Sequence, residues 1–129
     1  MKQKKETVPA FFSITETIQE ISNENYQLQQ WVFRKNKKDY ACYENTIIYF
    51  LEDCEVIFKS WDANRISMTD KQYIMLKTLY NMINTYDTND NRPEFDKDIV
   101  NDPKWHKIRI LAKQLYNDLK HVKYVKNSK

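Results

Sequence analysis

Residues 40–61 have the sequence YACYENTIIYFLEDCEVIFKSW, which carries the clearest helical pattern in the chain. Apolar residues recur along this stretch at alternating steps of three and four, the spacing that places them on one face of an α-helix. The stripe consists of Tyr40, Tyr43, Ile47, Phe50 or Leu51, Cys54, Ile57 or Phe58, and Trp61. We predict an amphipathic helix here, with Asp39 as its N-cap and the polar residues 62–65 as its end.

A weaker helical pattern precedes this stretch. Ser13 and Glu16 have the spacing of a capping box, in which each side chain accepts a hydrogen bond from a backbone amide at the helix start. The apolar stripe that follows consists of Ile14, Ile18, Ile21, Leu28 and Val32. Polar residues at 22–25 weaken its middle, so we expect a bend or break there. Basic residues at 34–38 suit a helix C-terminus and mark its end.

Two further helices follow. Thr69 and Gln72 form a second capping box, and the stripe after them consists of Leu76, Leu79 or Tyr80, Ile83 and Tyr86. Asp102 is the expected N-cap of the last helix, with Pro103 at the first helical position, where its missing N–H costs nothing. The last stripe consists of Trp105, Ile108, Ala112, Leu115, Leu119 and Val122.

Four amphipathic segments with short early connections predict an all-α fold, an antiparallel four-helix bundle. Residues 87–101 form an unusually long connector between the third and fourth helices, within which Pro93, Glu94, Phe95 and Ile99 suggest a short extra helical turn. We expect one helical domain over residues 1–129, with flexible ends at 1–9 and 124–129.

The composition excludes several classes of enzyme. The chain has 129 residues and no glycine, yet phosphate-binding loops, dinucleotide turns and nucleophile elbows depend on glycine. P-loop enzymes, Rossmann folds and α/β-hydrolases are therefore excluded. An AT-rich genome, whose codons disfavour glycine, is an alternative cause of the absence of glycine. Without glycine C-caps, the helices must end on Asn36, Asn64 and Asn89 or on polar connectors.

Metal and catalytic patterns are incomplete. Asp87, Asn89, Asn91 and Asp98 match ligand positions of a calcium loop, but Arg92 stands where that loop needs glycine. His106 and His121 lie about 22 Å apart along one helix and cannot share an ion. Cys42 and Cys54 are about 18 Å apart on one helix, too far for a disulfide. We expect free thiols, no metal, no cofactor and no enzymatic activity.

The charge and hydropathy bear on location and partners. Net charge is +3 with a sequence pI of about 8.7, below the range typical of dedicated nucleic-acid binders. No apolar run is long enough for a signal peptide or a membrane span. We therefore expect a cytoplasmic protein that does not enter membranes.

One end of the predicted bundle gathers aromatic residues beneath the acidic connector. The candidate partner-binding residues there are Trp31, Phe33, Tyr40, Tyr86, Arg92, Phe95, Asp96, Asp98 and Trp105. Trp, Tyr and Arg anchors carry most of the energy in protein interfaces. Alternatively, these aromatics only fill the end of the core while the acidic connector neutralises the basic run at 34–38.

The function we expect is a small non-enzymatic protein-binding module, such as an inhibitor, immunity or accessory factor of bacterial or phage origin. The apolar stripes could also be shared with a second copy in a homodimer. The alternative is nucleic-acid binding by a basic patch at the opposite end, which gathers Lys2, Lys4, Lys5, Arg65, Lys120, Lys123 and Lys126.

Overall fold

The computed structural model describes residues 9–34, 42–66 and 68–119, and every regular element within them is helical. The elements are α1 (Pro9–Ser22), α2 (Glu24–Tyr26), the π-helix η1 (Gln27–Val32), α3 (Tyr43–Asp62), α4 (Asp70–Asp87), α5 (Asp96–Val100) and α6 (Pro103–Leu119). The predicted all-α class is therefore confirmed for these parts of the chain.

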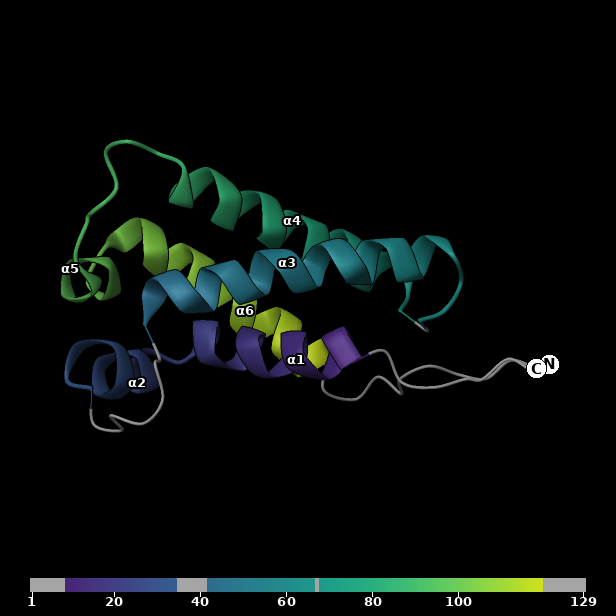
Figure 1. Ribbon diagram of the computed structural model, residues 1–129, viewed down its shortest axis with the longest axis horizontal. Helices are drawn as coiled ribbons and strands as arrows, with labels where there is room; N and C mark the ends of the chain where they lie inside the picture. Colours follow the sequence, from purple (N-terminus) through teal and green to yellow (C-terminus); the bar gives the residue numbers. More distant parts are fainter. Residues whose placement is uncertain (1–8, 35–41, 67, 120–129) are drawn as a thin grey trace.

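The four long helices enclose one hydrophobic core. α1 packs against α3 and α6, and α4 packs against the same two helices. Side chains from all four helices are fully buried between them, among them Ile18, Phe50, Leu79 and Leu115. The short elements α2 and α5 lie at one end of the molecule, and the turn between α3 and α4 lies at the other (Figure 1).

α3 buries the stripe expected from its sequence, since Ile47, Phe50, Cys54 and Ile57 are all at most 2% exposed. Its predicted N-cap, Asp39, lies outside the described residues. The helix begins instead at Tyr43, after Cys42, whose side chain forms no capping hydrogen bond.

The connector supplies the missing cap of α3. Asp96 Oδ2 accepts a hydrogen bond from the Tyr43 backbone amide at 3.1 Å, across 53 positions of sequence. A carboxylate at a helix N-terminus satisfies an orphan amide and complements the helix dipole, an effect of about 1 kcal/mol. Asp96 therefore ties the connector to the start of α3.

The first predicted helix is divided. α1 begins at Pro9 rather than at Ser13, so Ser13 lies inside the helix and the predicted capping box is wrong. The expected break occurs at Asn23, which has extended backbone angles and accepts a hydrogen bond through Oδ1 from the Tyr26 amide at 2.9 Å.

The π-helix then changes which residues face the core. Phe33 N–H bonds to Leu28 O at 2.9 Å, a five-residue step that rotates the face away from regular α-helical spacing. As a result Gln27 and Trp31 are buried, while Leu28 and Val32 are only partly buried. Leu28 and Val32 therefore pack against the edge of the core, and the fully buried positions are Gln27 and Trp31 instead.

The later helix starts agree with the sequence. Thr69 Oγ1 accepts from the Gln72 amide at 3.1 Å, and Gln72 Oε1 accepts from the Thr69 amide at 2.9 Å, which completes the predicted capping box. Asp102 Oδ1 accepts from the Lys104 amide at 3.0 Å, and α6 begins at Pro103. A short helix, α5, does form in the connector, but it starts directly after Phe95, so that of the four residues expected in the extra turn only Ile99 lies within it.

Asn64 ends α3 in the way glycine ends most helices. Its φ of 60° lies in the left-handed region, and the Arg65 amide bonds back to Ser60 O at 2.8 Å. Of the other predicted stops, Asn36 lies outside the described residues. Asn89 stays out of the left-handed region and instead accepts from the Asn91 amide at 2.8 Å, which shapes the connector.

The two cysteines are free thiols, as expected. Cys54 lies in the core of α3. Cys42 precedes α3 as its N-cap residue rather than lying within the helix, contrary to the prediction of one helix that carries both.

The left-handed conformation of Asn64 gives a test. Asn64→Ala should lower the free energy of unfolding by about 1 kcal/mol, because a β-carbon is disfavoured at this φ, whereas Asn64→Gly should retain stability. Asn81→Ala, at an exposed position inside α4, is the matched control and should be neutral or slightly stabilising. Urea unfolding measures all three, and an equal effect at both positions would contradict the C-cap role.

Candidate functional site

Four aromatic side chains from four elements meet beneath the connector, and we call them the aromatic cluster: Trp31, Tyr43, Tyr86 and Trp105. Trp105 lies at the centre, with ring centroids 6.0 Å from Trp31 and 5.5 Å from both tyrosines. All four are at most 6% exposed. Edge-to-face and tilted contacts of this kind are the favoured aromatic geometry.

The hydroxyl groups of the cluster reach carboxylates at the ends of the connector. Tyr43 donates to Asp87 Oδ1 at 2.9 Å, and Tyr86 donates to Asp102 Oδ2 at 2.7 Å. Burial is the main cause that raises the pKa of both phenols above the ordinary value of 10.0, and the adjacent carboxylates raise it further. Both hydroxyls are therefore held in their neutral, donating form.

Arg92 folds the first half of the connector back onto the cluster. Its guanidinium lies 4.9 Å from the centre of the Tyr43 ring and 3.5 Å from Asp87 Oδ1. It also donates to two backbone carbonyls, Asp87 O at 3.2 Å and Pro93 O at 2.7 Å. The Arg92 side chain thus provides hydrogen bonds to backbone carbonyls that lie before and after it in the connector.

A shallow, open pocket lies over this arrangement and has a volume of about 300 Å³. Its lining comes from the end of α4, the connector and the start of α6, and consists of Tyr86, Asn89, Asn91, Arg92, Pro93, Asp98, Asp102 and Lys104. Six of these eight residues have charged or amide side chains.

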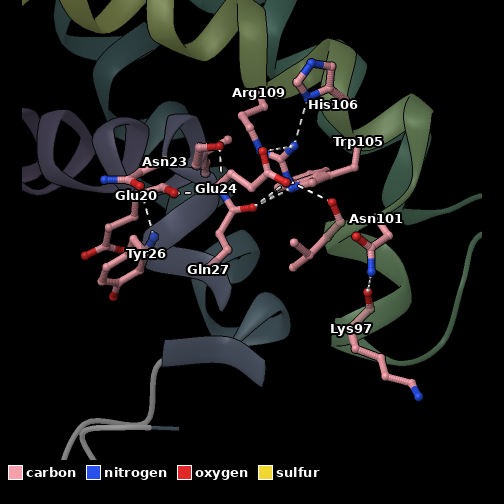
Figure 2. A network of polar contacts seen from close by, with 12 residues as sticks. Glu20, Asn23, Glu24, Tyr26, Gln27, Lys97, Asn101, Trp105, His106 and Arg109 are labelled. Atoms are coloured by element: carbon pink, nitrogen blue, oxygen red, sulfur yellow. Dashed lines mark hydrogen bonds and ion pairs between the residues drawn. The ribbon is translucent and has the colours of Figure 1, made fainter. Parts of the chain in front are cut away.

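A buried carboxamide joins the aromatic cluster to the broken first helix. Gln27 Nε2 donates to the carbonyls of Glu20 and Ile21, both at 2.8 Å. Gln27 Oε1 accepts from Trp105 Nε1 and from Arg109 Nη2, both at 3.0 Å. Figure 2 shows the Gln27 side chain directed at Trp105 and Arg109 on α6. All four hydrogen bonds are internal, and the residue is fully buried.

Arg109 extends this network to α5 and to the surface. Its Nη2 also donates to Val100 O at 2.9 Å, and its Nη1 lies 2.9 Å from His106 Nδ1. Because a guanidinium can only donate, His106 Nδ1 must be the unprotonated ring nitrogen. Glu24 Oε1 lies 3.7 Å from Nη1. Burial lowers the pKa of Arg109.

Sequence reasoning missed both Gln27 and Arg109. Gln27 follows a polar stretch and faces inward only because of the break and the π-helix. Arg109 lies between Ile108 and Ala112 on the buried side of α6. Its position beside the apolar stripe is the sequence signal that could have indicated a buried arginine.

The structure divides the predicted partner-binding residues into a buried group and a surface group. Trp31, Tyr86 and Trp105 are brought together but lie in the core, where packing is their evident role. Arg92 and Asp96 are half-buried and Asp98 is exposed. Phe33 and Phe95 are 64% and 65% exposed. Tyr40 lies outside the described residues.

The alternative basic patch falls almost wholly outside the described residues. Lys2, Lys4, Lys5, Lys120, Lys123 and Lys126 all lie in ranges that the structure does not describe. Arg65 is exposed after α3.

The described ranges also bear on metals and membranes. Within them, no three His, Cys, Asp or Glu side chains gather in an arrangement that could hold a metal ion. No helix in the same ranges combines the length and the apolar character that a membrane crossing requires.

Comparison of this chain with family models, curated proteins and solved structures finds no match. Proposals about its function therefore depend on its own residues.

The Gln27 network predicts a strong stability effect. Gln27→Ala should lower the free energy of unfolding by about 3 kcal/mol, because it leaves a buried guanidinium and an indole N–H without their acceptor. Gln30→Ala, a partly buried neighbour in the same π-helix, should cost less than about 1 kcal/mol. Chemical denaturation compares the two, and similar losses would contradict the role of Gln27.

The buried tyrosines predict a loss of stability at alkaline pH. Since folding raises their pKa, they contribute stability that is fully present below about pH 10 and is lost as the pH rises further. Urea unfolding of the wild type at about pH 9 and about pH 11 should show this loss. The double variant Tyr43→Phe, Tyr86→Phe should lose less between the two pH values, while Tyr49→Phe, which removes an exposed hydroxyl, should behave like the wild type.

Proposed function

We propose that this protein is a small non-enzymatic protein-binding module whose scaffold is an antiparallel four-helix bundle and whose partner docks on the connector end. The mutual packing of α1, α3, α4 and α6 supports the scaffold. The exposure of Phe33 and Phe95, which flank two elements that pack together, supports the docking surface. That pair of phenylalanines is the observation that carries the proposal.

Phe33 and Phe95 are placed as interface anchors. Phe33 directly follows η1 and Phe95 directly precedes α5, and η1 and α5 are in contact. Each ring keeps about two thirds of its surface in water, although burying it against a partner would gain roughly 1.5–3 kcal/mol. Aromatic anchors of this kind dominate interface energies.

The charge around these anchors indicates the character of the partner. Six carboxylates and two basic side chains lie between positions 87 and 102. The carboxylates at 90, 94 and 98 are exposed. Complementary charge speeds association and excludes wrong partners, so the partner surface should be basic around an apolar centre.

The connector is held in place before any partner arrives. Arg92 fixes its first half, Asp96 ties it to α3, and Arg109 holds the carbonyl of Val100. An ordered surface loses less conformational entropy on binding than a mobile loop would. An inhibitor, immunity or accessory factor of a bacterium or phage, acting in the cytoplasm, would use such a surface. If the partner is a second copy of this chain, the same end would form a homodimer interface.

Site-directed photo-crosslinking in the native cells tests the proposal. A photoreactive residue in place of Phe95 should form a specific adduct, and one in place of Ile74 should not. Ile74 is the matched control because it is 62% exposed on α4, away from the connector.

Affinity for the captured partner then provides the quantitative test. The double variant Phe33→Ala, Phe95→Ala should weaken binding at least about tenfold, while Ile74→Ala should bind like the wild type and both should keep their helical circular dichroism. Equal crosslinking from positions 95 and 74, or unchanged affinity of the double variant, would contradict the proposal.

A further inference from the structure

A second hollow of the surface lies apart from the connector pocket, and the two share no lining residue. It is an open groove of about 480 Å³ between the C-terminal end of α1 and one side of α6. The volume falls in the range of sites that hold small organic ligands. The lining side chains that matter here are Glu24, His106, Arg109, Ile110, Lys113 and Asn117.

Arg109 brings a buried positive charge to the floor of this groove. The residue is 5% exposed, and its Nε has no hydrogen-bond partner. Three of the partners of its other nitrogens are neutral acceptors: Gln27 Oε1, Val100 O and His106 Nδ1. Burial of a cation is costly, and close pairing with a negative charge offsets much of that cost; none of these three acceptors supplies a negative charge.

Glu24 supplies only partial compensation. Its carboxylate is 3.7 Å from Arg109 Nη1, and its side chain is 52% exposed. That separation exceeds the 2.7–2.9 Å of a charge-assisted hydrogen bond. Burial lowers the pKa of Arg109 and Glu24 only partly offsets the effect. The open volume of the groove therefore adjoins a guanidinium whose positive charge is only partly compensated.

The rest of the lining suits an anion with an organic part. Lys113 is exposed one helical turn beyond Arg109, and Asn117 follows one turn later, so the donors line up along α6. Glu24 is the single carboxylate among the described lining residues. Ile110 is 47% exposed and offers an apolar contact to the body of a ligand.

We propose that the groove between α1 and α6 binds a small organic anion, with a carboxylate or phosphate group held by Arg109 and Lys113. In the free protein, Glu24 stands near the place of that group and swings towards solvent when the ligand oxygen approaches Nη1. Ile110 then contacts the ligand's carbon skeleton. The site is independent of the partner surface proposed at the connector end.

The test uses succinate and inorganic phosphate as probes, each added at constant ionic strength to the full chain labelled with ¹⁵N. Amide shifts of residues 19–24 and 106–117 should change saturably with at least one probe. Saturation by succinate alone assigns a carboxylate ligand, saturation by phosphate alone assigns a phosphate monoester, and saturation by both leaves the oxyanion itself as the recognised group.

Matched variants separate a built site from general attraction to positive charge. Lys113→Gln should weaken binding about tenfold, as expected for the loss of one charge-assisted contact. Lys107→Gln, exposed on the same helix but outside the groove, should not change it. Glu24→Gln should tighten binding, because it removes the competing carboxylate.

Three results would overturn the proposal: no saturable shift with either probe at millimolar concentration, equal weakening by Lys113→Gln and Lys107→Gln, or weaker binding by Glu24→Gln. Lys113 and Lys107 are both exposed, so neither substitution should compromise folding, and thermal unfolding checks this. Equal crosslinking from positions 95 and 74, with anion binding in the groove retained, would count against the proposed function alone.

Discussion

The structure depends on the side chain of Gln27, which makes four buried hydrogen bonds, two to the end of α1 and two to side chains of α6. The interruption at Asn23 takes the carbonyls at the end of α1 out of the regular helical ladder, and Gln27 donates to two of them, Glu20 O and Ile21 O. Glu20 O also accepts from the Asn23 amide at 3.2 Å. The same carboxamide accepts from Trp105 and Arg109. A buried polar group costs a few kcal/mol unless it is paired. We therefore expect the interruption at Asn23 and the hydrogen bonds of Gln27 to form together.

The hydrogen bonds of Gln27 determine the position of both proposed surfaces, the connector end and the groove between α1 and α6. Through Trp105 they fix the centre of the aromatic cluster, on which Tyr43, Tyr86 and Arg92 hold the connector. Through Arg109 they fix α5 and leave a positive charge at the floor of the groove. Small domains are stable by only about 5–15 kcal/mol, so the loss of about 3 kcal/mol expected on removal of the Gln27 side chain would be a large part of the total.

Several local patterns were predictable from the sequence, although the Ser13 capping box was not among them, whereas hydrogen bonds between distant residues were not predictable. The Thr69 capping box, the Asp102 cap and the core stripe of α3 depend on residues within a turn or two of each other, and the structure agrees. Asp96 caps a helix 53 positions away, which no local pattern encodes. Gln27 rather than Leu28 is fully buried in the broken first helix, and its hydrogen bonds to the end of α1 and to α6 join residues that no local pattern relates.

The candidate site shows the same division. Trp31, Tyr86 and Trp105 do meet at one end of the molecule, because amphipathic spacing and helix length determine which ends coincide. Their burial, and the exposure of Phe33 and Phe95, depend on the packing of the short elements η1 and α5, which no local pattern encodes. Hydrogen exchange of the Trp105 indole N–H tests the account most directly. If Gln27 holds this end closed, that proton should exchange as slowly as the core amides of α6; exchange orders of magnitude faster, with those amides still protected, would contradict it.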